Sequence, residues 1–226
     1  MLNELLNNVL LDPVSTVGLI VFYILLILFP LALVAAVNKT SSKFIRIFTI
    51  VCNLLLAFQL FLRWIIAGHF PISNLYESLC FLSWGLTIFQ LFLENEYQSP
   101  IIPAITIPTV LFTLGFACFV LPDDLRLTSN LVPALRSSWL VMHVTVVMLS
   151  YAALILGSLL SASILLINIG QPLQIRSNSI GVGGVKFKND SSLKDLLEPF
   201  EFSHSEKIDT LSYRSILVGF VLLSLG

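Results

Sequence analysis

Charged residues are scarce in this sequence, and that scarcity sets the class of protein. Only 11% of its 226 residues are charged, whereas 57% are hydrophobic, and the mean hydropathy is +0.94. A soluble domain carries about 25% charged residues, so most of this chain cannot face water. The formal net charge of -1 also excludes a broad basic surface for nucleic acid, so we expect no nucleic-acid partner.

Motifs for soluble catalysis and for metal binding are missing as well. The three cysteines, Cys52, Cys80 and Cys118, lie inside apolar runs, and no two of them have Cys-x-x-Cys spacing. This argues against a zinc site or a thiol redox motif. The sequence also has no Ser-His-Asp pattern and no paired carboxylates within a hydrophobic run. We expect the cysteines to be small buried hydrophobic residues.

What the sequence does have is a series of long hydrophobic runs. About 20 apolar residues are needed to cross the hydrocarbon core of a bilayer. We therefore predict an all-α polytopic membrane protein with one membrane domain over residues 1–226 and about six transmembrane helices, the sixth cut short. The predicted spans are residues 15–37, 45–67, 75–93, 101–121, 139–169 and 211–226. The polar stretch 170–210 is predicted to be a cytoplasmic or stromal loop.

Lysine and arginine fall unequally on the two sides of this predicted topology. Six spans would place nine of the 12 basic residues on one side of the membrane and three, Arg63, Arg126 and Arg136, on the other. Cytoplasmic loops carry the excess of positive charge. The side with three is therefore predicted to be the lumen or periplasm, together with the N-terminus and the turn at residues 68–74.

Histidine is the residue type here that could bind a metal-containing group, and there are three. His143 lies one turn after Trp139, so both belong to one helix face at the outer end of the fifth span. A neutral imidazole there could ligate haem iron, or it could be an interfacial histidine beside a tryptophan of the aromatic belt. His69 lies in the outer turn and suggests an interfacial histidine. His204 lies in the polar loop, where we expect it to be solvated.

An acidic residue opens the third span. Asn74 at the N-cap and Glu77 three residues later match a capping box, and a negative charge suits the positive end of the helix dipole. On that interpretation, a Glu77→Gln change should be mild. Alternatively, Glu77 makes a polar contact inside the bundle, since ionisable groups within spans are costly and often functional. Arg63 could be its partner or could extend to the membrane interface.

Two long ungapped blocks carry a family resemblance. Residues 68–84 read GHFPISNLYESLCFLSW, residues 135–144 read LRSSWLVMHV, and a third block, DTLSYR, occupies residues 209–214. These blocks resemble the CcsA/ResC family of cytochrome c biogenesis proteins, in particular the plastid and cyanobacterial branch called CcsA (System II). The resemblance covers essentially the whole chain.

The resemblance implies a haem-handling subunit of a membrane cytochrome c synthase. Its cofactor would be haem b, bound transiently as the substrate to be attached. Its partners would be a CcsB-type membrane protein, the lipid membrane, and apocytochromes c such as cytochrome f and cytochrome c6, recognised at a Cys-x-x-Cys-His motif. His143 matches the family's first outer haem ligand, and Trp139 would pack on the haem. The implied location is the thylakoid membrane, with the N-terminus and His143 on the lumenal side.

The family's tryptophan-rich haem platform, called the WWD segment, and its later histidines would follow the sixth span. They are not among residues 1–226, so the chain is expected to correspond to the N-terminal part of such a protein and to be inactive alone. Whether it is catalytic stays open. Two other functions remain: a haem transporter without synthase activity, and a non-catalytic assembly subunit of a membrane complex.

Overall fold

The computed structural model describes residues 13–38, 43–97, 99–126, 137–167 and 199–226, and it is helical throughout these ranges apart from short turns. Six of the helices are long and apolar enough to cross a membrane. The elements are α2 (Pro13–Asn38), α3 (Lys43–Ala67), α4 (Leu75–Tyr97), α5 (Ile101–Gly115), the π-helix η1 (Phe116–Val120), α6 (Asp123–Arg126), α7 (Ser138–Ile167) and α8 (Pro199–Leu225). The prediction of an all-α polytopic membrane protein is thus confirmed.

Most boundaries lie within four residues of the predicted ones, and two larger differences concern the fourth and sixth runs. The fourth run ends in the π-helix η1 rather than continuing as an α-helix, and hydropathy carries no signal for such a change in hydrogen bonding. The sixth helix begins at Pro199, well before the predicted residue 211. Proline suits a first helical position, and the polar residues that follow it extend the helix beyond its apolar part. The remainder of the predicted loop, residues 170–198, lies outside the described residues.

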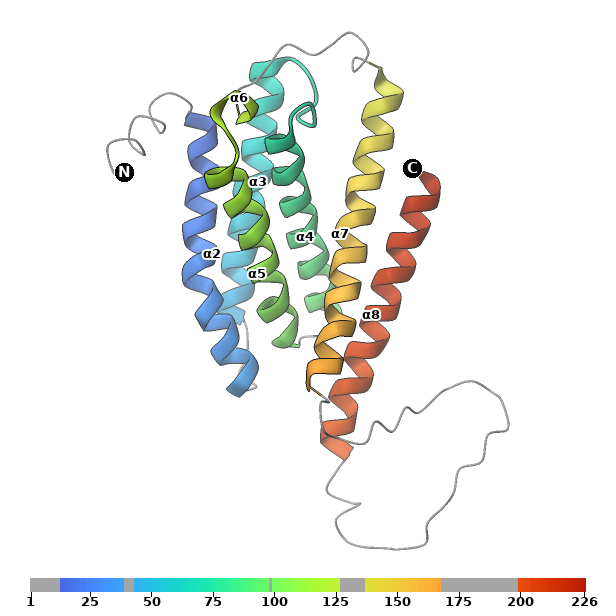
Figure 1. Cartoon of the computed structure of the whole chain (residues 1–226). Coiled ribbons are helices and arrows are strands. Elements are labelled where there is room, and N and C mark those ends of the chain that lie inside the picture. Colours follow the sequence, from blue (N-terminus) through green and yellow to red (C-terminus); the bar gives the residue numbers. More distant parts are fainter. Residues whose placement is uncertain (1–12, 39–42, 98, 127–136, 168–198) are drawn as a thin grey trace, which may run out of the picture.

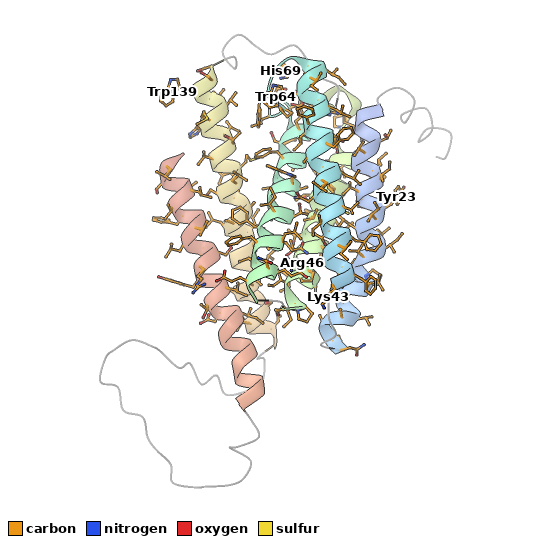
Figure 2. All side chains as sticks on the ribbon, turned by 180° about the vertical axis from the view of Figure 1, so that it is seen from behind. Tyr23, Lys43, Arg46, Trp64, His69 and Trp139 are labelled. Atoms are coloured by element: carbon orange, nitrogen blue, oxygen red, sulfur yellow. The ribbon has the colours of Figure 1, made fainter. Side chains whose placement is uncertain are left out.

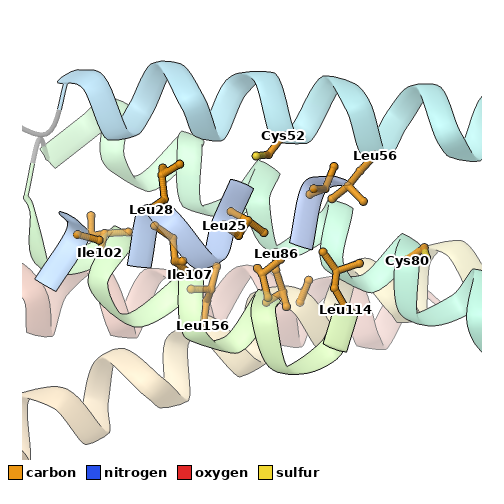
Figure 3. Close-up of a cluster of buried hydrophobic side chains, with 14 of the residues drawn as sticks. Leu25, Leu28, Cys52, Leu56, Cys80, Leu86, Ile102, Ile107, Leu114 and Leu156 are labelled. Atoms are coloured by element: carbon orange, nitrogen blue, oxygen red, sulfur yellow. The ribbon is translucent and has the colours of Figure 1, made fainter. Parts of the chain in front are cut away.

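The helices form a bundle with an attached pair (Figure 1). α2, α3, α4 and α5 pack together, α7 packs on α4, and α8 packs on α7. The core consists of fully buried aliphatic side chains contributed by several helices, among them Leu25, Leu56, Leu86, Ile107 and Leu156 (Figure 3). Many large apolar side chains on the outer surface remain exposed. Such a surface fits contact with lipid, whose chains are as apolar as these side chains.

Successive long helices run in opposite directions, so their ends lie at two opposite ends of the bundle. The upper end, as seen in Figure 1, has the start of α2, the turn before α4, α6, the start of α7 and the end of α8. The lower end has the starts of α3, α5 and α8. Lys43 and Arg46 lie at the lower end (Figure 2), and Arg63 and Arg126 lie in contact at the upper end. These four residues follow the predicted separation of basic residues.

Candidate functional site

The predicted tryptophan–histidine pair lies at the start of α7, and both side chains are exposed on the outside of the bundle. Trp139 lies in the first turn of α7 with 84% of its surface exposed, at the upper end (Figure 2). His143 follows one turn later and is also exposed, as is Met142 between them. Residues four apart lie on the same helix face. An imidazole and an indole thus lie together on an accessible surface at the upper end.

A backbone contact orients the His143 ring. Its Nδ1 lies within hydrogen-bonding distance of the backbone oxygen of Gly226, at the upper end of α8. An oxygen of this kind only accepts, so Nδ1 carries the proton in a neutral ring. The lone pair of Nε2 is then available. Histidines that ligate metals commonly hold the other ring N–H on a carbonyl in this manner.

The remaining histidines do not join this pair in the described contacts. His69 lies in the turn before α4, half-buried, with Nδ1 3.3 Å from the carbonyl oxygen of Phe70. Trp64 stacks edge-on against Phe70 next to it, at 5.3 Å between ring centroids. His204 lies in the first part of α8, and its side chain is outside the described part of the chain. Among the described residues, no group of three or more His, Cys, Asp or Glu could hold a metal ion.

A second polar feature of the upper end is a buried ion pair between α3 and α4. Arg63 Nη1 lies 3.4 Å from Glu77 Oε1, and the two side chains are 2% and 0% exposed. Glu77 Oε2 accepts hydrogen bonds from the backbone N–H and the hydroxyl of Ser73, at 3.0 and 2.8 Å. Glu77 therefore bonds the residue before the N-cap Asn74 while it also neutralises Arg63. Arg63 does not extend to the interface.

Arg63 also binds the end of α6. Nη1 and Nη2 each donate to the carbonyl oxygen of Arg126, both at 3.2 Å, at the end of α6. The guanidinium carbon lies 4.4 Å from the centroid of the Tyr76 ring, a distance at which a cation and an aromatic face attract. One buried cation thus ties together α3, the first turn of α4 and α6.

Below this ion pair, buried polar groups continue along the bundle. The hydroxyl of Tyr76 accepts a hydrogen bond from Gln59 Nε2 at 2.9 Å, and the same amide nitrogen lies 3.9 Å from the sulfur of Cys80. All three cysteines are buried with free thiols. Sequence reasoning did not find the contacts of Gln59 with Tyr76 and Cys80, because they join α3 to α4. Periodicity within one helix cannot predict which residues of another helix will face it.

Comparisons with known proteins match most of the chain to one family. The family described as "Cytochrome C assembly protein" matches residues 72–226, a range that contains Glu77, Trp139 and His143. The matched range begins at the turn before α4 and continues through α7 and α8.

Individual relatives match over nearly the whole chain. A cytochrome c biogenesis protein CcsA from Prochlorococcus marinus subsp. pastoris strain MED4 is 66% identical over 98% of this chain and 70% of its own length. The protein of the same name from strain MIT 9215 is 65% identical over 100% of this chain and 73% of its own. The one from strain SARG is 52% identical, over 96% and 70%.

Proposed function

The chain belongs to the cytochrome c assembly protein family, and from that premise we propose that it holds haem b at the upper end of the bundle for attachment to apocytochromes c. The observation that carries the proposal is the His143 imidazole, which is exposed and held at Nδ1 by α8. Its Nε2 would ligate the haem iron. The exposed face of Trp139, one turn away, would pack on the porphyrin edge.

The chemistry to be served is thioether formation. Each thiol of a Cys-x-x-Cys-His motif adds its sulfur and its hydrogen across one haem vinyl group, so no atom leaves and no net electron transfer occurs. The protein's contribution would be to orient the porphyrin so that its vinyl groups meet the thiols. An axial imidazole also tunes the iron potential. The Arg63–Glu77 pair at this end would not touch the haem, because neither side chain reaches the surface. Its role would be to hold the helices in place.

The two ends of the bundle would face different compartments. The unequal distribution of lysine and arginine favours the lower end as the cytoplasmic or stromal side. The upper end, with His143, would then face the lumen, where apocytochromes c are matured. Resemblance to the plastid and cyanobacterial branch supports the thylakoid as the membrane, and a CcsB-type protein as the partner in the synthase.

Two other functions remain to be separated from this one. A haem transporter would need a route across the bundle, yet the polar side chains along α4 are packed to 0–1% exposure at Ser83, Thr87 and Gln90. This close packing favours a protein that presents haem at one end of the bundle over one that moves haem through it. A non-catalytic assembly subunit would bind no haem at all.

Haem content of purified protein tests the proposal. The full-length protein is purified from membranes and its haem is measured by the pyridine haemochrome spectrum. We expect a His143→Ala variant to lose haem. A Met142→Ala variant, changed at the neighbouring exposed position, should keep it. Equal haem in both variants would rule out His143 as a ligand, and absence of haem from the unchanged protein would favour an assembly subunit.

A further inference from the structure

A stripe of polar side chains runs along one face of α4 from end to end of the membrane-spanning length. It begins at Glu77 and Cys80, continues with Ser83, Thr87 and Gln90, and ends at Glu94, with successive members three or four residues apart. These side chains are each no more than 1% exposed. Polar groups inside a membrane bundle are costly unless they are hydrogen-bonded. Each polar group of the stripe therefore needs a hydrogen-bond partner inside the bundle.

Most side chains of the stripe have hydrogen-bond partners on neighbouring helices. Ser83 shares a hydrogen bond of 2.8 Å with Thr113 of α5. Thr87 accepts one of 2.7 Å from Asn53 Nδ2 of α3, and its own hydroxyl donates to the carbonyl of Trp84. The upper levels hold the Glu77–Arg63 pair already described.

Gln90 is different. Its side chain is fully buried, and neither Nε2 nor Oε1 has a hydrogen-bond partner among the described residues. A buried primary amide offers two donors and one acceptor with two lone pairs. Leaving all of them unsatisfied is among the more expensive arrangements that a packed core can contain.

The helix register predicts which residues lie level with Gln90. Ser83 of α4 bonds Thr113 of α5. Gln90 lies two turns after Ser83, and Thr106 lies two turns before Thr113. Because the two helices are antiparallel, Thr106 and Gln90 lie at the same height in the bundle. Asn53 of α3 bonds Thr87 of α4, and Arg46 bonds Asn95. Thr49 lies between these two contacts on α3, at the height of Gln90. Both threonines are fully buried. Each donates its hydroxyl hydrogen to its own helix, Thr49 to Ile45 and Thr106 to Ile102, at 2.9 and 2.8 Å.

We propose that Gln90 forms a buried water-binding site between α3, α4 and α5, with the hydroxyl oxygens of Thr49 and Thr106 as further acceptors. The ligand must both accept from and donate to a neutral amide, which water does. A metal cation is a poorer fit, because Ca²⁺ or Mg²⁺ would require six or more oxygen ligands, typically with carboxylates. Buried waters usually make about three hydrogen bonds to otherwise unsatisfied groups.

The site would complete the hydrogen bonding of the α4 face. With water at Gln90, the polar groups from Glu77 through Ser83 and Thr87 down to this level would all be satisfied within the bundle. The inference does not depend on haem binding, since Gln90 lies on the inner face of α4 while His143 lies on the exposed surface of α7. Failure of one proposal therefore leaves the other standing.

Radiolytic footprinting tests the water site. Hydroxyl radicals formed from bound water during a short X-ray exposure oxidise the side chains next to that water. Leu86 and Leu93 lie one turn to either side of Gln90 on the same face of α4, and Leu25 in α2 is an equally buried leucine that serves as the reference. The experiment uses the whole chain in lipid nanodiscs, with H₂¹⁸O to mark oxygen derived from water.

We expect Leu86 and Leu93 to incorporate ¹⁸O while Leu25 does not. Gln90→Met, which removes the amide at similar length, should abolish the labelling, and Thr106→Val should reduce it. Thr109→Val is the matched control, because Thr109 also bonds its own helix but is only partly buried, and it should change nothing. Labelling of Leu86 and Leu93 no greater than that of Leu25 would overturn the proposal. So would labelling that persists in Gln90→Met; if that variant fails to fold, unchanged labelling in Thr106→Val has the same meaning.

Discussion

The hydroxyl of Ser212 in α8 donates a hydrogen bond of 2.9 Å to the backbone carbonyl of Gly157 in α7. The same kind of contact recurs along this helix pair, from Ser150 to Gly219 and from Ser215 to Ala153, at 2.8 and 2.9 Å. Small residues allow helix backbones in membranes to approach closely, and serines hydrogen-bond across the interface. The pairing matters for the candidate site because α8 packs on α7 and its upper end orients His143.

Gly157 should tolerate no side chain. A Cβ atom there would lie 3.0 Å from the backbone nitrogen of Ile216 and 3.2 Å from the carbonyl oxygen of Ser212, so the two helix backbones would have to separate. Overpacking of this kind typically costs about 1–3 kcal/mol. We expect Gly157→Ala to lower the midpoint of thermal unfolding in detergent, although alanine is the better helix former.

Ser158→Ala is the control for that measurement, because Ser158 is the exposed neighbour and its hydroxyl bonds Ile155 of its own helix. It should leave the midpoint nearly unchanged. A Gly157→Ala variant as stable as the unchanged protein would mean that α7 and α8 are not packed as closely as described.

The Glu77 carboxylate is predicted to matter through its charge. The capping interpretation predicted that Glu77→Gln is mild, because glutamine keeps a capping-box acceptor. In the structure, the same change leaves the Arg63 guanidinium buried without its ion-pair partner, and breaking a buried pair on one side costs about 3–5 kcal/mol. We expect Glu77→Gln to lower the amount of folded protein in membranes, measured by fluorescence-detected size exclusion.

The reciprocal change separates charge from packing. Arg63→Met alone should also be destabilising, since it removes the donors to the Arg126 carbonyl and leaves the buried Glu77 carboxyl without its ion-pair partner. The double variant Arg63→Met with Glu77→Gln should be more stable than the sum of the two single effects, with an interaction term of about 0.5–3 kcal/mol. Strict additivity would show that the two side chains do not interact.

Hydropathy predicted the long helices well because the bilayer imposes one requirement on all of them, a continuous apolar run. The same rule could not locate the start of α8 at Pro199 or the π-helix at Phe116–Val120. These depend on polar residues outside the apolar run and on local hydrogen bonding. The rule also had no information on how helices pair.

At the candidate site too, features of a single helix could be predicted, whereas contacts between helices could not. The face shared by Trp139 and His143 followed from helix geometry alone, and Arg63 was recognised as one possible partner of Glu77. The bond from Arg63 to the Arg126 carbonyl could not be predicted, since it joins residues 63 positions apart. Nor could the lack of partners at Gln90, because that property belongs to three packed helices rather than to one.

Topology is the next prediction. Cysteines introduced at Asn130 and at Asn178, both outside the described residues, should react with an impermeant maleimide from opposite sides of the membrane. The reason is that α7 lies between them in sequence and is long enough to cross, and the lysine and arginine distribution places Asn178 on the cytoplasmic or stromal side. Labelling of both positions from the same side would contradict the crossing.

Imidazole rescue gives the sharpest test of His143. In the full-length protein, His143→Gly removes the proposed ligand but not the α7 backbone. We expect normal insertion and loss of both bound haem and holocytochrome c, measured by haem staining. Free imidazole can enter the space left by the side chain and coordinate the iron in its place, so its addition should restore part of the haem binding and part of the holocytochrome.

His143→Trp is the matched control, because the indole fills the same space and has no basic nitrogen to bind iron; imidazole should not rescue it. His69→Gly tests the other upper-end histidine, whose Nδ1 contacts Phe70, and rescue there would indicate a second ligand. If His143→Gly keeps an unchanged haem spectrum, the ring is an interfacial histidine. Its contact with Gly226 would then serve only to hold α7 against α8, and Trp139 would be a tryptophan of the aromatic belt.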